Sequence, residues 1–465
     1  MTINFKQVAQ ASGITAFSNY TPAPTSRSYV LSPTTPVLVF DLGQGGSFPY
    51  VGLVNGSSAQ LLYSSTAGLD NSNPSPLWFL NAILVGGAGS TSSGLAPWYG
   101  AYNISSNSFN YAINIQPLSG SPQSLQDVTL DFQNQVAYLF YRSSNVSNAI
   151  IYAISFSNLA GLVSNLQFPS SYSVAYFTAP NAPSVFSVEG GVLVYYNQTF
   201  YINTYDGSGN YYVFVVQYSS LTWSSTFPSS VQAVGSLYQY MTGGTTDVPN
   251  GEMFLNYIVS GSTITAELLI YAVTNYNSSN YYYGTVAIYS FNLSNNTATQ
   301  LYSSTSANAK GTAVNMGGII VFAQIVSGSS GAWNTAVGVF DRNLNIYEIS
   351  QTFNSVQDTF VSQGGYAVVV SGSTSSLTFT VYQILLDTTP TIQNLSYNGG
   401  TLTGTVVDQT SGNPLANITV FLIQLASEGD DWAGGAVIAS TTTNTSGGFS
   451  FSISQTGYYA VYAVP

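Results

Sequence analysis

The stretch YYNQTFYINTYDGSGNYYVFVVQYSS, residues 195–220, contains two strand-like segments on either side of a short turn. INTY (202–205) and YYVFVV (211–216) are rich in aromatic and β-branched residues, which favour strands. DGSGN (206–210) begins with Asp-Gly and ends with Gly-Asn, and both dipeptides are typical of hairpin turns. The stretch therefore predicts two antiparallel strands joined by a tight hairpin.

The same turn carries oxygen-bearing side chains at the spacing that opens a calcium-binding loop. An EF-hand loop continues with a glycine and ends with a glutamate, at positions where this chain has Tyr211 and Gln217. We therefore interpret Asp206 as a turn residue and predict no metal site in this hairpin.

Strand groups of this kind recur along most of the chain. A glycine pair precedes an apolar strand in EGGVLVYYN (189–197), MGGIIVFAQ (316–324) and QGGYAVVVS (363–371). The groups start near residues 37, 79, 135, 191, 252, 317 and 365, so that they lie about 40 to 65 residues apart. Repeats of roughly four strands indicate sheets arranged around an axis, where each sheet buries the faces of its neighbours.

We predict an all-β protein with an N-terminal arm (1–30), a β-propeller of seven blades (31–388) and a small β-sandwich (389–465). The segment DTTPTIQNLSYN (387–398) is polar, contains Pro390 and interrupts the repeat, which places the boundary there. The glycine pairs and tyrosine-bearing hairpins loosely resemble kelch-type propellers, without the full motif of that family. A set of β-sandwich domains is the alternative that the strand pattern leaves open.

The C-terminal segment carries a more specific pattern. GTLTGTVVDQTSGNPLANITVFL is followed, after a loop, by TTTNTSGGFSFSISQTGYYAVYAV. It resembles the carboxypeptidase regulatory-like (transthyretin-like) family, whose motif is matched in order by Gly404, Val406, Asp408, Gly412, Pro414, Leu415, Val420, Gly448, Phe449, Phe451, Gly457 and Tyr459. The resemblance implies an Ig-like sandwich used as a spacer, stalk or adhesive module, and it implies no chemistry. The acidic loop ASEGDDWAGG (426–435) departs from the family pattern.

Charge is scarce throughout the chain. Charged residues make up 5% of the 465 residues, whereas the chain has 67 serines, 44 threonines and 36 tyrosines. Hydroxyls and amides bind water at any pH, whereas carboxylates lose their charge in acid, so this composition fits an acidic exterior. A low-charge surface protein from a neutral habitat is the alternative. The five basic residues are scattered, which argues against binding to nucleic acid or to an anionic membrane.

The residue types limit catalysis. Because the chain has no histidine and no cysteine, Ser-His-Asp and Cys-His triads, disulfides and zinc sites built on these residues cannot form. Asp127 and Asp131 lie four residues apart and Glu428, Asp430 and Asp431 cluster in the C-terminal loop, yet no pattern indicates the convergent pair of a glycosidase. We predict that the chain is not an enzyme and has neither a cofactor nor a metal site. A carbohydrate-active propeller enzyme is the less favoured alternative, and a weak cation site at residues 428–431 stays open.

The sequence also bears on location and modification. The first twenty residues lack the basic and apolar regions of a secretory signal, and no apolar run is long enough to span a membrane. Asn-x-Ser/Thr sequons occur at eleven positions, close to the number that chance gives in so hydroxyl-rich a chain. We predict N-glycosylation first at Asn55, Asn277, Asn292, Asn295 and Asn444, followed by Asn103, Asn145, Asn394, Asn19, Asn197 and Asn417.

Tyrosine is the remaining candidate for recognition. Three tyrosines in a polar hairpin, Tyr281, Tyr282 and Tyr283, offer large rings with a polar tip, which suit binding to proteins or sugars. Elsewhere, tyrosines can equally fill half-buried strand positions, because β-propensity favours them there.

The composition and domain order resemble surface and tail-spike proteins of thermoacidophilic archaeal, spindle-shaped viruses. This resemblance implies a structural and host-attachment protein on the virion surface that is glycosylated and oligomeric. Its expected partners are other virion or envelope proteins and a glycan or protein receptor on the host. The alternative is an archaeal cell-surface adhesin, or a protein associated with the S-layer or a filament.

Overall fold

A computed structural model describes most of the chain. The described residues are 3–14, 29–30, 37–41, 50–55, 58–64, 69–70, 77–79, 82–91, 94–103, 108–113, 122–131, 133–143, 145–165, 167–183, 186–187, 192–242, 251–260, 263–274, 284–316, 318–329, 332–342, 344–362, 365–373, 376–386, 390–409, 411–425 and 436–464. Between residues 29 and 124 the description covers the backbone and few side chains. Almost every described element is a strand, so the prediction of an all-β protein is confirmed.

Four sheets follow one another in the first half of the chain. The first contains β2 (Tyr29–Val30), β3 (Val37–Asp41), β4 (Tyr50–Asn55) and β5 (Ser58–Ser64). The second contains β6 (Leu69–Asp70), β7 (Leu77–Phe79), β8 (Ala82–Thr91), β9 (Gly94–Asn103) and β10 (Ser108–Ile113). The third contains β11 (Pro122–Asp131), β12 (Val136–Ser143), β13 (Asn148–Ser155), β14 (Ser173–Thr178) and β19 (Gln232–Ala233). The fourth contains β15 (Phe186–Ser187), β16 (Leu193–Tyr196), β17 (Thr199–Asp206), β18 (Tyr211–Gln217) and β20 (Ser236–Met241).

Two further sheets complete this part of the molecule. The fifth has eight strands, namely β21 (Gly251–Ser260), β22 (Thr263–Thr274), β23 (Gly284–Asn292), β24 (Thr297–Asn315), β25 (Ile319–Ser329), β26 (Ala332–Asp341), β27 (Ile346–Ile349) and β28 (Phe353–Val356). The sixth has the order β1-β31-β30-β29, with β1 (Ile3–Ile14), β29 (Asp358–Ser362), β30 (Tyr366–Ser373) and β31 (Ser376–Leu386). Most neighbouring strands in these sheets pair antiparallel with a strand next to them in sequence, as the repeat pattern predicts.

Apolar clusters join successive sheets from the second to the sixth. One cluster combines Phe140 and Ile151 of the third sheet with Phe200 of the fourth. Another combines Tyr201 of the fourth sheet with Leu268 of the fifth. The second and third sheets share a cluster, as do the fifth and sixth, and the two halves of the fifth sheet are joined in the same way. Face-to-face burial between successive sheets is therefore the main source of the core.

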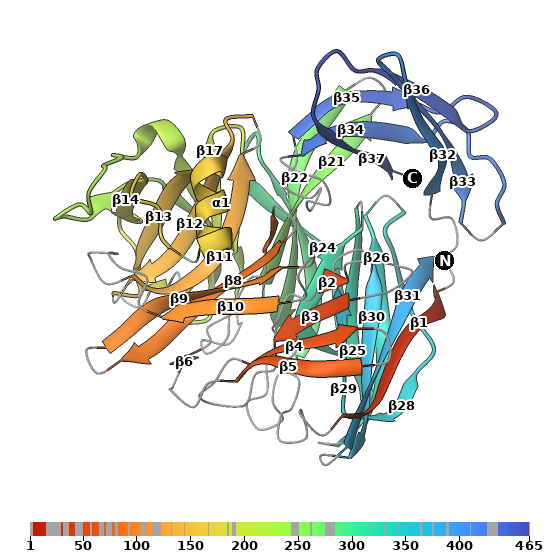
Figure 1. The fold of residues 1–465 in the computed structure, drawn as a ribbon, viewed down its shortest axis with the longest axis horizontal. Coiled ribbons are helices and arrows are strands. Elements are labelled where there is room, and N and C mark those ends of the chain that lie inside the picture. The colour runs from red at the N-terminus through yellow and green to blue at the C-terminus, as the bar shows by residue number, and fades with distance from the viewer. Residues whose placement is uncertain are drawn as a thin grey trace.

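Strand β1 closes this series of sheets. It pairs antiparallel with β31 from Ile3↔Leu386 to Ile14↔Leu377, and it also contacts β5 of the first sheet. Figure 1 shows β1 beside β31, with the first sheet close to both. Residues 1–30 were predicted as an arm outside the sheets, whereas Ile3–Ile14 form the edge strand of the sixth sheet. The hydrophobic pattern of β1 is too weak to reveal this pairing from sequence.

One α-helix occurs in the described part of the chain, and sequence analysis did not predict it. Helix α1 (Phe156–Asn165) follows β13, and a single 3₁₀ turn, η1 (Tyr218–Ser220), follows β18. Ser155 accepts a hydrogen bond from the backbone N–H of Asn158 at 3.4 Å, the position of an N-cap. Leu159 and Leu162 are fully buried against the third sheet. The helix was missed because it has only ten residues, too few for its apolar residues to establish a helical period.

The C-terminal residues form two three-stranded sheets that share a core. One contains β32 (Pro390–Asn398), β33 (Thr401–Asp408) and β36 (Gly448–Ser452), and the other contains β34 (Thr419–Leu425), β35 (Ala436–Thr442) and β37 (Tyr458–Val464). Their cluster includes Phe449, Phe451 and Val420, three of the motif positions. Figure 1 shows these blue sheets beside β21 and β22, where Tyr257 packs on Phe421 with a ring-centroid distance of 5.8 Å.

Candidate functional site

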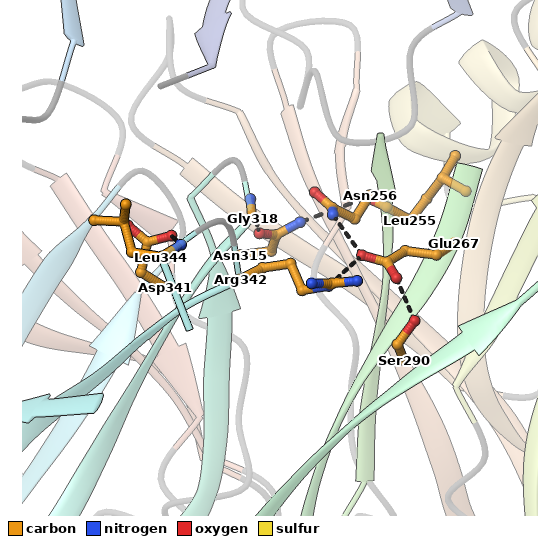
Figure 2. A network of polar contacts seen from close by, with 9 residues as sticks. All are labelled: Leu255, Asn256, Glu267, Ser290, Asn315, Gly318, Asp341, Arg342 and Leu344. Carbon is orange, nitrogen blue, oxygen red and sulfur yellow. Dashed lines mark hydrogen bonds and ion pairs between the residues drawn. The ribbon is translucent and has the colours of Figure 1, made fainter. Parts of the chain in front are cut away.

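A buried carboxylate, Glu267 of β22, lies at the centre of the polar network in Figure 2. Its side chain is 3% exposed. Glu267 Oε1 accepts a hydrogen bond from Asn256 Nδ2 at 3.0 Å and pairs with Arg342 Nε at 3.0 Å. Glu267 Oε2 accepts a hydrogen bond from Ser290 Oγ. Three donors therefore hold this single carboxylate.

Strand register brings these residues together. Asn256 lies directly opposite Glu267 across the β21–β22 pair. Glu267 lies opposite Asn292 across the β22–β23 pair, which places Ser290 one diagonal step away. Opposed and diagonal neighbours on one sheet face lie within reach of each other. Arg342 immediately follows β26, so the ion pair links the first and second halves of the eight-stranded sheet.

Two turns beside this network are fixed by side-chain hydrogen bonds (Figure 2). The Asn315 amide accepts from the Gly318 N–H at 2.8 Å and donates to the Leu255 carbonyl at 3.4 Å. The carboxylate of Asp341 accepts from the Leu344 N–H at 3.1 Å. Chemically, the network is a hydrogen-bonded ion pair with a buried carboxylate and a partly exposed arginine, and its first effect is to hold four strands in one position.

The carboxylates of Asp127 and Asp131 are both buried on β11 but contact different groups. Asp127 Oδ2 accepts from the Leu193 N–H of the fourth sheet at 2.8 Å, and Oδ1 accepts from the Val128 N–H. Asp131 accepts two hydrogen bonds from Asn134 in the following turn. The structure thus uses Asp127 to tie two sheets together and Asp131 to shape a turn.

A weak cation site at residues 428–431 was the open alternative from sequence. Residues 428–431 lie outside the described residues. Among the residues that the structure describes, no group of three or more acidic side chains could hold a metal ion.

The predicted hairpin at Asp206 is confirmed. Strands β17 and β18 pair from Thr199↔Gln217 to Tyr205↔Tyr211 around this turn. Asp206 Oδ1 accepts from the backbone N–H groups of Ser208 and Asn210, and Oδ2 accepts from Asn210 Nδ2 and the Tyr212 hydroxyl. Burial alone would raise the pKa of Asp206, but these hydrogen bonds outweigh it and hold the pKa below its usual range.

The structure describes the side chains of seven of the eleven sequon asparagines, and all seven are exposed: Asn145, Asn197, Asn292, Asn295, Asn394, Asn417 and Asn444. Asn55 and Asn103 end strands β4 and β9, and their side chains lie outside the description. Asn19 and Asn277 lie outside the described residues.

The described sequons fall into two conformations. In the first, the asparagine Oδ1 accepts a hydrogen bond from the hydroxyl two residues later, at 2.6 Å for Asn292 and Asn295 and at 2.9 Å for Asn444. In the second, the asparagine has a positive φ, as at Asn197, Asn394 and Asn417. Asn145 resembles the first group, because its Oδ1 accepts from the Ser147 N–H at 3.2 Å. In the first conformation the hydrogen bond is made by the amide oxygen, so the amide nitrogen takes no part in it.

The tyrosines lie deeper than the composition suggested. Tyr141, Tyr152, Tyr211 and Tyr271 are among the largest fully buried side chains, whereas Tyr397 is 59% exposed. Exposed asparagine, serine and threonine residues form much of the described surface at the turns. Many of the tyrosines instead contribute to the core. The recognition candidates Tyr281, Tyr282 and Tyr283 lie outside the described residues.

Comparison with known proteins finds likeness in structure only. No protein-family model and no curated sequence matches the chain. Similar solved structures include a polysaccharide lyase of family PL25, an ulvan lyase (10% identity, 82% of this chain and 96% of that chain, TM-score 0.45). The β-propeller domain of the Trilobed protease from Pyrococcus furiosus is also similar (8% identity, 75% and 92%, TM-score 0.34). A third is the GH62 α-L-arabinofuranosidase catalytic domain of Coprinopsis cinerea (13% identity, 66% and 89%, TM-score 0.33).

These matches correct one prediction. We predicted that the chain is not an enzyme, and this is contradicted by the lyase and glycoside hydrolases among the structures it resembles. That prediction rested on residue types, and the lack of histidine and cysteine does not exclude glycoside chemistry, because carboxylates alone suffice for it. At TM-scores below 0.5 the matches transfer no activity to this chain.

In the described residues, no helix is long and apolar enough to cross a membrane.

Proposed function

We propose that this protein is a surface-exposed attachment protein of a virus particle, whose propeller-like head contacts the surface of the host cell. The observation that carries the proposal is the inward placement of its acidic side chains. Of the 17 acidic residues in the chain, at least six are buried: Asp127, Asp131, Asp206, Glu267, Asp341 and Asp358. The exterior is therefore even poorer in charge than the composition alone implies.

An exterior of this kind suits a protein that must work outside the cell. Exposed Asx turns at Asn292, Asn295 and Asn444 carry amides and hydroxyls that stay hydrated whether or not carboxylates are ionised. The hydrogen bonds that Asp206 accepts hold its pKa below the usual range, so this carboxylate keeps its charge at lower pH than a free one. Both features support function in an acidic medium.

The architecture supports a head and a second module. We propose that the eight-stranded sheet comprises two blades, β21–β24 and β25–β28, which gives a seven-bladed propeller closed by β1. The two C-terminal sheets then serve as the transthyretin-like stalk or docking module. Other virion proteins would bind the stalk, and a host glycan or protein receptor would bind the head. A cellular adhesin with the same surface chemistry is the alternative.

Immunogold electron microscopy on native material tests the proposal. With antibody raised against the purified chain, we expect gold particles on the outside of virus particles. Labelling of a cell envelope without particles would replace the viral assignment with the adhesin. Labelling confined to the cytoplasm would overturn both.

Peptide mass spectrometry of the native protein tests the glycosylated surface. We expect glycans on Asn292, Asn295 and Asn444, whose amide oxygens accept from the sequon hydroxyl, in preference to Asn394 and Asn417, whose backbones have positive φ. Unmodified asparagine at all three positions in native material would contradict this part of the proposal.

A further inference from the structure

Five aromatic side chains gather where the third and fourth sheets meet, at the end marked by the β11–β12 and β16–β17 turns. They are Tyr138 of β12, Tyr195 of β16, Phe200 of β17, Tyr218 of η1 and Trp223. We call them the aromatic platform. Tyr138 and Phe200 are buried and form its floor, whereas Tyr195, Tyr218 and Trp223 are half-buried at its surface.

The rings of the platform pack closely. The centroid of Tyr138 lies 4.7 Å from that of Tyr195 and 4.9 Å from that of Phe200. Tyr218 and Trp223 are stacked, with centroids 5.0 Å apart and an interplanar angle of 29°. The indole N–H of Trp223 donates to the Tyr218 carbonyl at 3.4 Å, so the ring position is fixed before any ligand arrives.

Polar groups surround the platform. Asp131, 7% exposed, interacts with the hydroxyl of Tyr195 and accepts two hydrogen bonds from Asn134. The exposed side chains of Asn134, Gln198 and Thr222 supply amides and a hydroxyl near the same turns. The Gln198 carbonyl also accepts the Tyr218 N–H at 2.8 Å, which ties the rim to η1.

We propose that the aromatic platform is a binding site for a neutral saccharide. A sugar ring presents apolar C–H faces, which pack on aromatic rings, and hydroxyls at its edge, which pair with amides and hydroxyls. Prearranged rings with few well-placed polar groups are the usual composition of a small-ligand site. The carboxylate of Asp131 disfavours acidic sugars, because like charges in a partly buried site repel. This inference rests on the proposed function, since it names the receptor class that the head would bind.

The test uses the full chain and a panel of oligosaccharides. Neutral glucan, mannan and xylan fragments and an acidic polyuronate fragment are titrated against the wild type, W223A and Y397A. Tyr397 is an exposed aromatic residue on the distant strand β32, so Y397A controls for the loss of any surface ring. Binding is followed by calorimetry, and folding of each variant by its unfolding midpoint.

We expect a neutral fragment to bind the wild type and Y397A equally, and W223A at least about tenfold more weakly. W223F keeps an aromatic ring and should recover part of the affinity. It also serves as the test variant if W223A fails to fold. Equal affinity of W223A and the wild type would overturn the inference, as would binding of the acidic fragment alone. If no saccharide binds while gold still labels virus particles, this inference fails and the proposed function stands.

Discussion

Asp206 closes the β17–β18 hairpin by accepting four hydrogen bonds, from Ser208, Asn210 and Tyr212. Each contact favours the charged carboxylate over the protonated form, which is why the pKa of Asp206 falls below its usual range although burial opposes this. One of the few charges of the chain therefore stabilises a turn from inside.

Replacing Asp206 tests this directly. Asp206→Asn puts an amide nitrogen where an acceptor is needed, so we expect the free energy of unfolding to drop by about 1–3 kcal/mol at neutral pH. Because the folded pKa is lowered, the stabilisation is present above the unfolded pKa of about 4 and is lost as pH falls below it. The gap between wild type and variant should therefore narrow below about pH 4.

Denaturant unfolding at several pH values measures this gap. Ser208→Ala is the matched control, because Ser208 contributes its backbone N–H to the turn and its own side chain is exposed. A gap between wild type and Asp206→Asn that stays constant to the lowest pH would contradict this account of the turn.

Glu267 carries a second prediction at this scale. Glu267→Gln keeps the shape of the side chain but removes the charge that pairs with Arg342, so we expect a loss of about 1–3 kcal/mol. In a double-mutant cycle with Arg342→Met, the two effects should be less than additive, because the residues share one interaction. Additive effects would show that the ion pair contributes nothing.

At the scale of elements, strand β1 determines whether the series of sheets closes. Ala11 is fully buried and lies opposite Phe379 of β31, whereas the next residue, Ser12, is exposed. Ala11→Asp would bury an unpaired carboxylate and should cost several kcal/mol or prevent folding. Ser12→Asp changes the neighbouring residue in the same way and should stay within about 0.5 kcal/mol of the wild type. Equal melting temperatures for the two variants would contradict closure by β1.

Sequence could predict elements whose signal is local. The hairpin at 206–210 was predicted from its turn dipeptides, and the strand groups from apolar runs and glycine pairs. The pairing of β1 with β31 could not be predicted, because it joins residues more than 360 positions apart and has no local pattern. The network of Glu267 and Arg342 was hidden for the same reason, as was the gathering of Tyr138, Tyr195 and Trp223 from three separate segments of the chain.

At the scale of the whole molecule, several of the few charged side chains lie inside the fold, and uncharged polar side chains lie at the turns. At least six of the 17 acidic side chains are buried, tyrosines form much of the described core, and amides and hydroxyls occupy the described turns. Burial raises the pKa of many tyrosines, and that of Tyr347 to about 12. Buried tyrosines do not destabilise the fold in acid, because the phenol group is neutral at low pH.

The buried tyrosines should instead limit the stability of the fold at alkaline pH. A group whose folded pKa is raised stabilises the fold below its unfolded pKa, which is about 10 for tyrosine, and this contribution is lost at higher pH. We expect cooperative unfolding between about pH 10 and 12, with the buried hydroxyls ionising only as the fold opens. Tyrosinate absorbance and circular dichroism, followed together, check this. Full ionisation of the tyrosines with native dichroism would contradict it.

We propose that an exterior poor in charge attaches this protein to another surface. The most direct measurement is the adsorption of the purified full chain to immobilised envelope polysaccharide from the host cell, as a function of salt and pH. We expect the adsorbed amount to change less than about threefold between low salt and 1 M salt, because few charges take part in the contact. We also expect adsorption to persist from neutral pH to about pH 3, where surface carboxylates are protonated. Absence of adsorption, or adsorption abolished by salt, would contradict attachment through an exterior that is poor in charge.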